Sequence, residues 1–354
     1  MVNYNFFKNK RILVTGHTGF KGSWLVTWLN LLGSKVMGIS LNPSDSENHF
    51  NILKNDLKII DRRGDIRNFE YLKKNIKKFK PDIVFHLAAQ AIVSTSYKYP
   101  KETIETNVLG TLNLLNILSE LKHKCITVLI TSDKCYKNIE VSRGYKETDQ
   151  LGGDDFYSSS KASAELIINS FYKSFIKDKN KFLRIATARA GNVIGGGDWS
   201  KNRLIPDCVR FWSKNKVVIL RNPNATRPWQ HVLEALSGYL HLAYQLNKNK
   251  SLNGESFNFS NNQIKNFTVL KFIKGIQKFW KKANWKVNKK VFFYESTLLQ
   301  LNSSKSKKIL KWKNKLKLNE TIKMVAEWYL AYYKNNSRKI LTKDQIIYYM
   351  KKNK

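Results

Sequence analysis

Two side chains that can move a proton, Tyr157 and Lys161, lie four residues apart in a segment, Tyr157–Phe175, that we predict to be helical. Residues four apart share one face of a helix, so the ammonium is expected beside the phenol. A neighbouring cation lowers the pKa of a phenol, and the phenolate then becomes accessible near neutral pH. Such a phenolate can take a proton from an alcohol while the alcohol carbon is oxidised. The alternative is a chance Tyr–Lys pair on a surface helix.

A second group of proton-transferring side chains, Ser132-Asp133-Lys134, follows a predicted buried strand, Ile126–Thr131. The Ser132 hydroxyl is placed to hydrogen-bond the same alcohol. Asp133 is suited to act as an acid if burial raises its pKa. Lys134 is suited to act as a base only if burial or neighbouring cations depress its pKa; otherwise its charge stabilises an enolate. The alternative for both residues is a solvated turn that does no chemistry.

A glycine-rich segment, Thr15–Gly22 (TGHTGFKG), connects a predicted strand, Lys10–Gly16, to a predicted helix, Gly22–Leu32. In dinucleotide-binding folds, the first glycine of such a segment allows a tight turn, the second lets backbone approach a pyrophosphate, and the third lets the helix pack closely. The N-terminus of the helix favours the phosphates. The segment therefore predicts a dinucleotide site, the alternative being a glycine turn without a ligand. The residues of this segment in the predicted site are Gly16, Thr18, Gly19, Phe20 and Gly22.

Segments that follow the later strands supply the other predicted cofactor contacts. The loop Ser40-Leu41-Asn42 contains neither the acidic residue that usually holds the ribose hydroxyls of NAD nor an arginine for the 2′-phosphate of NADP. Asp65 is expected to accept a hydrogen bond from the adenine amino group or, alternatively, to cap a helix. Small residues in His86–Gln90 (HLAAQ) would let a dinucleotide lie close to a strand end. The predicted contacts from these later segments are Asp65, Ile66, Leu87, Ala88, Ala89 and Thr106.

Predicted strands and helices alternate along the first half of the chain, which favours an α/β fold with a doubly wound parallel sheet covered by helices on both faces. The further strands are Lys35–Ile39, Pro81–Leu87 and Arg184–Ala188, and the helices between them include Leu72–Phe79 and Thr106–Leu121. We predict a Rossmann-like cofactor domain over residues 1–190, rejoined by about 226–260. Residues 191–225 and 261–350 are predicted to form a smaller α/β substrate-binding lobe, with helices Thr268–Trp280 and Thr321–Tyr333. The segment after Lys334 is predicted to be mobile unless Ile346–Met350 docks.

The charge of the chain is strongly positive, because 63 Lys and Arg residues face 26 Asp and Glu residues for a net charge of +37. A nucleic-acid binder is the first class that such a charge suggests. However, the lysines are spread over the chain, and the densest run, Lys73–Lys80, carries Ile76 and Phe79 at helical spacing. We therefore interpret this run as a solvated helix face and not as a nucleic-acid site. A positive surface would still attract an anionic substrate.

The three cysteines, Cys125, Cys135 and Cys208, have no spacing typical of a zinc site or a disulfide framework, so no metal site is predicted. No apolar run approaches the roughly 20 residues that cross a bilayer. The polar and aromatic start lacks the apolar region of a signal peptide. A cytoplasmic protein without membrane contact is expected.

Taken together, the TGxxGxxG segment, the strand that ends in Thr-Ser and the YxxxK motif resemble the extended short-chain dehydrogenase/reductase superfamily. An aspartate beside the serine is similar to the nucleotide-sugar 4,6-dehydratases, and the lysine after it resembles the CDP-glucose 4,6-dehydratase branch. Long blocks strengthen this resemblance from about Phe7 to Tyr349: GHTGFKGSWL, TSDKCY, LGGDDFYSSSKA, ARAGNVIGGGDW, RLIPD and RPWQHV.

The resemblance implies a reaction on CDP-glucose with tightly bound NAD. The sugar is oxidised at C4, water is eliminated across C5 and C6, and the hydride returns to C6. The resemblance assigns catalysis to Ser132, Asp133, Lys134, Tyr157 and Lys161. The resemblance places Asn192 and Arg227 at the diphosphate of the substrate, where the planar fork of arginine suits a phosphate. Gln90, Arg203 and Leu204 complete the predicted substrate site, and Asn302 stands where relatives often have an aspartate.

The resemblance also implies a homodimer through helices Thr106–Leu121 and Tyr157–Phe175, and a role in deoxysugar biosynthesis such as that of lipopolysaccharide O-antigens. No nucleic-acid partner is expected. Alternatives within the same fold are a GDP-mannose dehydratase or a 4-epimerase, against which Lys134 and RPWQHV argue. A catalytically idle dinucleotide sensor is an alternative of another class, against which the presence of Asp133, Tyr157 and Lys161 argues.

Overall fold

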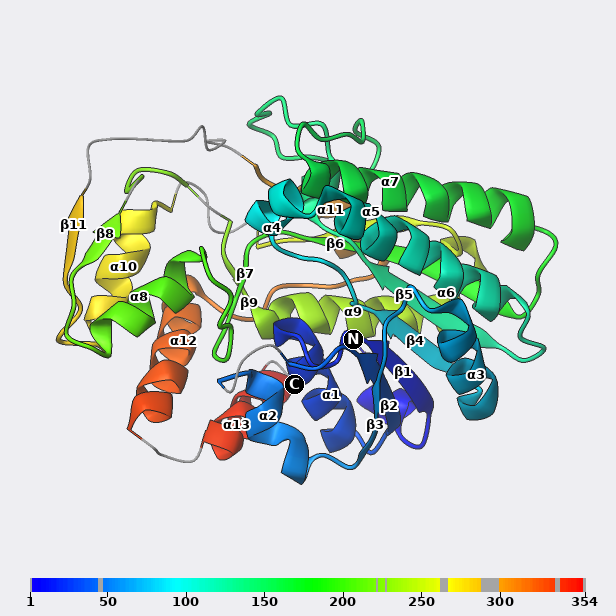
Figure 1. Cartoon of the computed structure of the whole chain (residues 1–354), viewed down its shortest axis with the longest axis horizontal. Coiled ribbons are helices and arrows are strands. Elements are labelled where there is room, and N and C mark those ends of the chain that lie inside the picture. The colour runs from blue at the N-terminus through cyan, green and yellow to red at the C-terminus, as the bar shows by residue number, and fades with distance from the viewer. Residues whose placement is uncertain are drawn as a thin grey trace.

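A seven-stranded parallel sheet forms the centre of the computed structural model, with the strand order β10-β6-β5-β4-β1-β2-β3 (Figure 1). The order reverses between β1 and β4, and the crevice outside the carboxyl ends of two such strands is where α/β sheets bind ligands. The predicted α/β class is therefore confirmed. The strands are β1 (Arg11–Thr15), β2 (Lys35–Ser40), β3 (Ile59–Arg63), β4 (Ile83–His86), β5 (Cys125–Ile130), β6 (Leu183–Ala190) and β10 (Ser256–Phe259).

The structure describes residues 2–43, 47–220, 222–226, 228–261, 267–287, 299–334 and 338–352. The predicted substrate contact Arg227 lies outside these residues.

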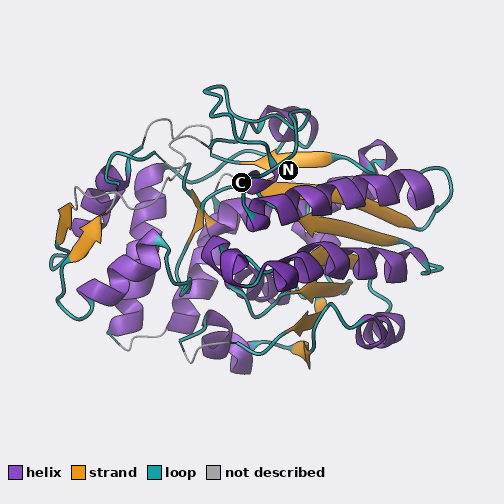
Figure 2. Cartoon of the chain, turned by 45° about the horizontal axis from the view of Figure 1, so that its top comes forward, coloured by secondary structure: helices purple, strands orange, loops and turns teal. Residues whose placement is uncertain are grey.

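Helices cover both faces of the sheet (Figure 2). Alternate residues of one strand serve different faces, since Leu13 belongs to one hydrophobic cluster while Val14 belongs to the other. Helices α3 (Phe69–Phe79), α6 (Gly110–Ser119) and α7 (Phe156–Phe171) contribute side chains to the cluster of Leu13. Helices α1 (Phe20–Leu31) and α9 (Val232–Lys248) contribute to that of Val14.

Helix α9 is absent from the sequence-based predictions, and its burial explains why. Fourteen of its residues are buried, among them Glu234 and His241. A helix surrounded by protein has no continuous polar face, so its apolar residues do not recur at the helical period that sequence reasoning detects.

Shorter elements complete the chain. The helices α8, α10 and α12 lie together with β8 and β11 at one end of the molecule (Figure 1). Strand β7 (Val193–Ile194) pairs with β9 (Gln230–His231), and β8 (Val218–Leu220) pairs with β11 (Trp285–Val287). The division into two lobes stays a prediction. The remaining helices are α2 (His49–Leu53), α4 (Val93–Lys98), α5 (Pro100–Ile104), α8 (Leu204–Trp212), α10 (Val269–Gln277), α11 (Ser304–Ile309), α12 (Leu318–Tyr333) and α13 (Arg338–Lys351).

The last helix, α13, packs against the N-terminal half of the chain. Ile346 and Tyr349 are fully buried, and the Tyr349 hydroxyl donates to Oε2 of Glu234 in α9 at 2.7 Å. The Tyr349 ring also lies 5.6 Å from the ring of Trp28 in α1. Of the two outcomes left open for this segment, the structure therefore shows the docking of Ile346–Met350.

Candidate active site

The glycine-rich segment lies against the carboxyl end of β4. Gly16 has a φ of +74°, and a Cβ added to it would lie 2.6 Å from the backbone nitrogen of Ala88. A Cβ on Gly22 would lie 2.1 Å from the carbonyl oxygen of Gly16. Only glycine fits these two positions, and Gly19 forms the N-cap of α1. The segment thus brings a helix N-terminus and bare backbone to the strand-order reversal, an arrangement that fits the pyrophosphate of a dinucleotide.

The glycine-rich segment and the end of β4 together form the cradle proposed for the dinucleotide. Thr15 and the residues after β4 lie at its edge. The backbone N–H of Ala88 donates to Oγ1 of Thr15 at 3.3 Å, which ties the ends of β1 and β4 together. Leu87, Ala88 and Ala89 are all partly exposed, as a contact surface for a ligand requires.

The loop after β2 is joined to the glycine segment through Thr18. The Thr18 and Ser40 hydroxyls are 2.7 Å apart, and Thr18 also donates to the carbonyl of Leu41 at 3.2 Å. Arg63, at the end of β3, donates to the same carbonyl at 3.3 Å. The loop itself contains no arginine, and Arg63 reaches it because β3 pairs with β2.

Asp65 and its neighbours occupy the end of the adjacent strand. The Asp65 carboxylate accepts from the Arg67 backbone at 2.8 Å and pairs with its guanidinium at 2.6 Å. The helix-capping alternative for Asp65 is wrong, since Asn68 caps α3, and the predicted contact of Asp65 with adenine stays a prediction. Ile66 is buried against Gly110, and Thr106 lies in a π-helical turn over Glu105–Leu109. Such turns are frequent at functional sites.

Tyr157 and Lys161 are both buried in the first turns of α7, with exposed fractions of 8% and 6%. The Lys161 ammonium lies 5.9 Å from the centroid of the Tyr157 ring. Burial raises the pKa of Tyr157 to about 12, although hydrogen bonding from Ser132 and the charge of Arg203 lower it. The expectation that Lys161 would bring this pKa toward neutrality is therefore wrong, because the cost of burying the phenolate outweighs the hydrogen bond from Ser132 and the charge of Arg203. Burial lowers the pKa of Lys161 itself to about 8.

Asp133 is buried and its pKa is raised, as its predicted role as an acid requires. It lies in the short helix η4 (Asp133–Cys135), is only 6% exposed and has a pKa that burial raises above its ordinary value. The charge of Lys134 and a 2.9 Å hydrogen bond from Ser132 oppose this rise only in part. A buried carboxyl group that holds its proton can donate it. Lys134 itself is half-buried, which leaves both of its predicted roles open.

Three of the predicted substrate contacts lie in the part of the chain that follows β6. Arg203 pairs with Asp198 at 3.0 Å, and its charge acts on the pKa of Tyr157, which places it beside the buried catalytic group. Asn192 is half-buried next to β7, and its carbonyl accepts from Gln230 at 3.0 Å. Leu204 begins α8 and is half-buried.

Gln90 is engaged within its own loop. Its side-chain oxygen accepts from the Ile92 backbone at 2.6 Å, and its side-chain nitrogen donates to Thr103 at 2.9 Å. In this structure its amide therefore orders the segment between β4 and α5, and a substrate contact through the amide would require these bonds to be exchanged.

Lys21 is a charged neighbour of the site that sequence reasoning missed. Its ammonium lies 3.5 Å from the hydroxyl of Tyr239. The pKa of Lys21 is lowered to about 7, chiefly by burial and also by the charges of Lys161 and Arg203, while the charge of Asp133 opposes the shift. The signal was a lysine in the first turn of α1, where the helix dipole disfavours a cation.

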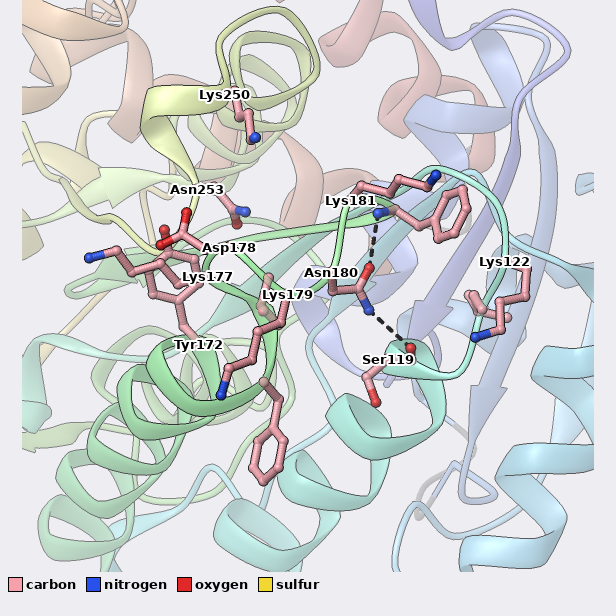
Figure 3. Close-up of a pocket in the computed structure, with 14 residues that line it drawn as sticks. Ser119, Lys122, Tyr172, Lys177, Asp178, Lys179, Asn180, Lys181, Lys250 and Asn253 are labelled. Carbon is pink, nitrogen blue, oxygen red and sulfur yellow. Dashed lines mark hydrogen bonds between the residues drawn. The ribbon is translucent and has the colours of Figure 1, made fainter.

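One cavity lies away from these residues. It has a volume of about 620 Å³ and is lined by the end of α6, the π-helical turn η5 (Tyr172–Ile176) that follows α7, and the loop before β6 (Figure 3). Its lining includes five lysines and Asn180, whose amide donates to the carbonyl of Ser119 at 3.0 Å. Since Phe182 in its wall directly precedes β6, the cavity opens at the amino ends of the strands, whereas the predicted site lies at their carboxyl ends.

Two further observations hold for the part of the chain that the structure describes. No group of three or more His, Cys, Asp or Glu side chains is arranged to hold a metal ion. None of the helices there combines the length and the apolar character needed to cross a membrane.

The sequence and the fold both match known proteins. The sequence pattern of a family described as GDP-mannose 4,6 dehydratase matches residues 13–325. CDP-glucose 4,6-dehydratase of Salmonella typhimurium is 42% identical over 355 residues, covering 99% of both chains.

Solved structures share the fold at lower identity. An epimerase of Methanothermobacter thermautotrophicus superposes with a TM-score of 0.82 at 22% identity, covering 94% of this chain and 95% of its own. A dTDP-glucose 4,6-dehydratase of Bacillus anthracis, solved in complex with NAD, has a TM-score of 0.74 at 23% identity, covering 94% of this chain and 99% of its own.

Proposed function

Because this chain belongs to the GDP-mannose 4,6 dehydratase family, we propose that it is an NAD-dependent 4,6-dehydratase that converts CDP-glucose to CDP-4-dehydro-6-deoxyglucose. The observation that carries the substrate assignment is the 42% identity to a CDP-glucose 4,6-dehydratase over 99% of both chains. The buried Asp133 beside Tyr157 supports a dehydration, since the elimination of water needs an acid that a simple epimerisation does not.

NAD fits the cradle formed by the glycine segment. Gly16, Gly19 and Gly22 keep its floor free of side chains, and the N-terminus of α1 offers backbone N–H groups to a pyrophosphate. Thr18, Phe20, Leu87, Ala88, Ala89 and Thr106 would line the remainder. When bound there, NAD would accept a hydride from C4 of the sugar and return it to C6.

Tyr157 would take the proton of the C4 hydroxyl in the first step. Because burial raises the pKa of Tyr157, its phenolate needs favourable charges and hydrogen bonds around it. Ser132 and Arg203 already act in this direction, since both lower the pKa against the effect of burial. Lys161, on the same face of α7, would hold the phenolate and the cofactor ribose in place.

Asp133 and Lys134 would carry the elimination. Oxidation at C4 makes the C5 proton acidic, and Asp133 would protonate the departing C6 hydroxyl. Lys134 would remove the C5 proton or stabilise the resulting enolate. Its half-buried side chain is consistent with either role.

The substrate diphosphate would be held by cationic and amide groups at the carboxyl edge of the sheet. Arg203, whose charge acts on the pKa of Tyr157, and Asn192, which follows β6, would do so, and Leu204 would cover the nucleotide. Arg227, outside the described residues, stays a predicted phosphate contact.

We also propose a cytoplasmic homodimer that serves deoxysugar biosynthesis and needs neither a membrane nor nucleic acid. Large apolar side chains on and next to α6 and α7 support the dimer. Leu166 on α7, Phe175 in the turn that follows α7 and Leu109 just before α6 are 55%, 59% and 48% exposed. Solvent exposure of several such residues on neighbouring helices is typical of an interaction surface.

The test is to incubate the purified protein with CDP-glucose, dTDP-glucose, GDP-mannose and UDP-glucose in turn and to analyse the products by mass and NMR. We expect a 4-dehydro-6-deoxy sugar from CDP-glucose without net consumption of cofactor. Higher efficiency with dTDP-glucose would overturn the substrate assignment, and the absence of product from every sugar would overturn the enzyme assignment.

A further inference from the structure

A buried ion pair between Glu165 and Arg189 lies beneath the catalytic residues. The guanidinium of Arg189 donates from Nε to Oε1 of Glu165 at 2.8 Å and from Nη2 to Oε2 at 2.9 Å. Both residues are 3% exposed. A buried pair of this kind gains little net stability over apolar side chains of similar size. We therefore interpret the pair as a means of holding the groups around it in fixed positions.

The pair contacts both ends of the segment that carries the proposed acid. The hydroxyl of Thr131 donates to Oε1 of Glu165 at 2.5 Å, and Nη1 of Arg189 donates to the hydroxyl of Tyr136 at 2.7 Å. Thr131 and Tyr136 bracket the segment 132–135, which contains Ser132, Asp133 and Lys134. One carboxylate and one guanidinium therefore clamp this segment from both sides.

The same pair is anchored to the helix of the proposed base. Glu165 lies on α7 four residues after Lys161 and eight after Tyr157, so the three side chains follow one face of the helix. Arg189 lies on β6, the strand next to β5, which leads into the clamped segment. The Glu165 charge also raises the pKa of Lys161 against the effect of burial.

We propose that Glu165 and Arg189 are positioning residues that fix the acid-bearing segment 131–136 against the helix of Tyr157 and Lys161. This inference rests on the proposed dehydratase function for its consequence, which is that the elimination step depends on the clamp more than the oxidation step does. Tyr157 and Lys161 belong to the helix itself, whereas Asp133 is joined to that helix through these side-chain bonds.

Tyr136 offers a mild way to test the clamp. Its hydroxyl accepts from Arg189 and donates to Oδ1 of Asn258 at 2.9 Å, and its ring lies 4.9 Å from the guanidinium carbon. Tyr136→Phe removes the hydroxyl while the ring and the Glu165–Arg189 pair remain. Charge-removing changes at Glu165 would instead leave a buried, unpaired cation and endanger the fold.

Tyr145 provides the matched control. Its ring stacks on that of Tyr136 at a centroid distance of 5.1 Å and an angle of 21°, and both rings are 2% exposed. The Tyr145 hydroxyl, however, donates to Asn138 and accepts from the Ile139 backbone. Tyr145→Phe therefore removes a buried hydroxyl of the same kind without touching the clamp.

The first measurement is amide hydrogen exchange of peptides that contain residues 131–136, on the full chain without substrate. A lost net hydrogen bond is worth about 1 kcal/mol, so we expect exchange in this segment to rise roughly fivefold or more in Tyr136→Phe. In Tyr145→Phe the segment should exchange as in the wild type. Equal exchange in all three proteins would overturn the clamp whatever the enzyme's substrate is.

The second measurement separates the two half-reactions after rapid mixing with CDP-glucose. In Tyr136→Phe we expect release of the 6-deoxy product to fall by roughly 10-fold to 10²-fold, since small misplacements of a catalytic group have effects of this size. Formation of reduced cofactor should fall less, because Tyr157 and Lys161 stay in place and only Ser132 of the oxidation step lies on the clamped segment. A merely structural role would slow both steps together, and that result would contradict the proposal. If wild-type protein does not convert CDP-glucose, the proposed function fails and the exchange comparison alone decides the clamp.

Discussion

Asp133 and Gly191 face each other across the ends of β5 and β6, and a Cβ added at residue 191 would lie 2.9 Å from Oδ2 of Asp133. That distance is shorter than a carbon and a carboxylate oxygen tolerate, so a methyl group there must displace the carboxylate. The backbone at residue 191 thus sets the position of the proposed acid.

The first prediction concerns this contact. Gly191→Ala should leave cofactor binding intact and slow formation of the 6-deoxy product by roughly 10²-fold, because the acid is moved away from the C6 hydroxyl. Product formation by the variant at the wild-type rate would show that the carboxylate has room to shift without consequence. Fluorescence of the bound cofactor is the control, because it shows that the glycine-rich segment still binds the cofactor.

Replacement of Tyr157 by phenylalanine should block the first oxidation, since the phenol oxygen is the proposed acceptor of the C4 hydroxyl proton. The loss of a general base typically lowers the rate roughly 10²–10⁴-fold. The measurement is single-turnover reduction of bound NAD on mixing with CDP-glucose. Near-normal reduction in this variant would remove Tyr157 from the role.

Asp133→Asn should oxidise the sugar and then stall. The two side chains are nearly isosteric, and Ser132, Tyr157 and Lys161 remain for the first step. An amide cannot protonate the leaving C6 hydroxyl, so bound NADH should accumulate with little 6-deoxy product. If this variant loses NADH formation as completely as Tyr157→Phe does, Asp133 instead positions the sugar and another acid is required.

Lys134→Met tests the C5 base. If Lys134 removes the C5 proton, the variant should still form NADH, but deuterium from solvent should no longer enter C5 of the recovered sugar. Undiminished exchange would assign Lys134 to stabilisation of the enolate. Asp133→Asn is the matched background, because it holds the oxidised sugar in the site long enough for the exchange to be measured by NMR.

The raised pKa of Asp133 also predicts how stability depends on pH. The native state binds this proton more tightly than the unfolded state, in which the pKa is near 3.8, so the contribution is present below that value and is lost as pH rises through the native pKa. Above this range the buried carboxylate destabilises the fold, and Asp133→Asn does not carry that cost. The melting temperature of the variant should therefore exceed that of the wild type at about pH 8, with a smaller difference at about pH 4. An equal difference at both values would contradict the pKa shift.

Local patterns predicted much of the fold and the backbone of the site. The glycine spacing of 16, 19 and 22 implied a strand, a turn and a helix, and the structure has β1 and α1 on either side of that turn. Tyr157 and Lys161 share a face of α7 because four residues make about one helical turn. Relations of this kind depend only on residues close in sequence.

What the sequence did not reveal depends on burial and on pairing between distant segments. The pKa of Tyr157 was misjudged because a favourable neighbouring cation is visible in a motif, whereas the cost of removing the phenol from water is not. Glu165 and Arg189 are 24 residues apart on different elements, and their bond became apparent only when α7 was packed against β6. Arg63 reached the loop after β2 in the same way, through the pairing of β2 with β3.

The docking of α13 on α1 has a consequence for how the chain folds during synthesis. Trp28 emerges from the ribosome long before its partner Tyr349, and the sheet gains the edge strand β10 only after Phe259. The surface of α1 that α13 covers is therefore exposed until α13 has been made, when long-range contacts finally cover it. A chaperone that shields nascent apolar surface should bind translation intermediates that end before residue 338 more strongly than it binds intermediates that include α13.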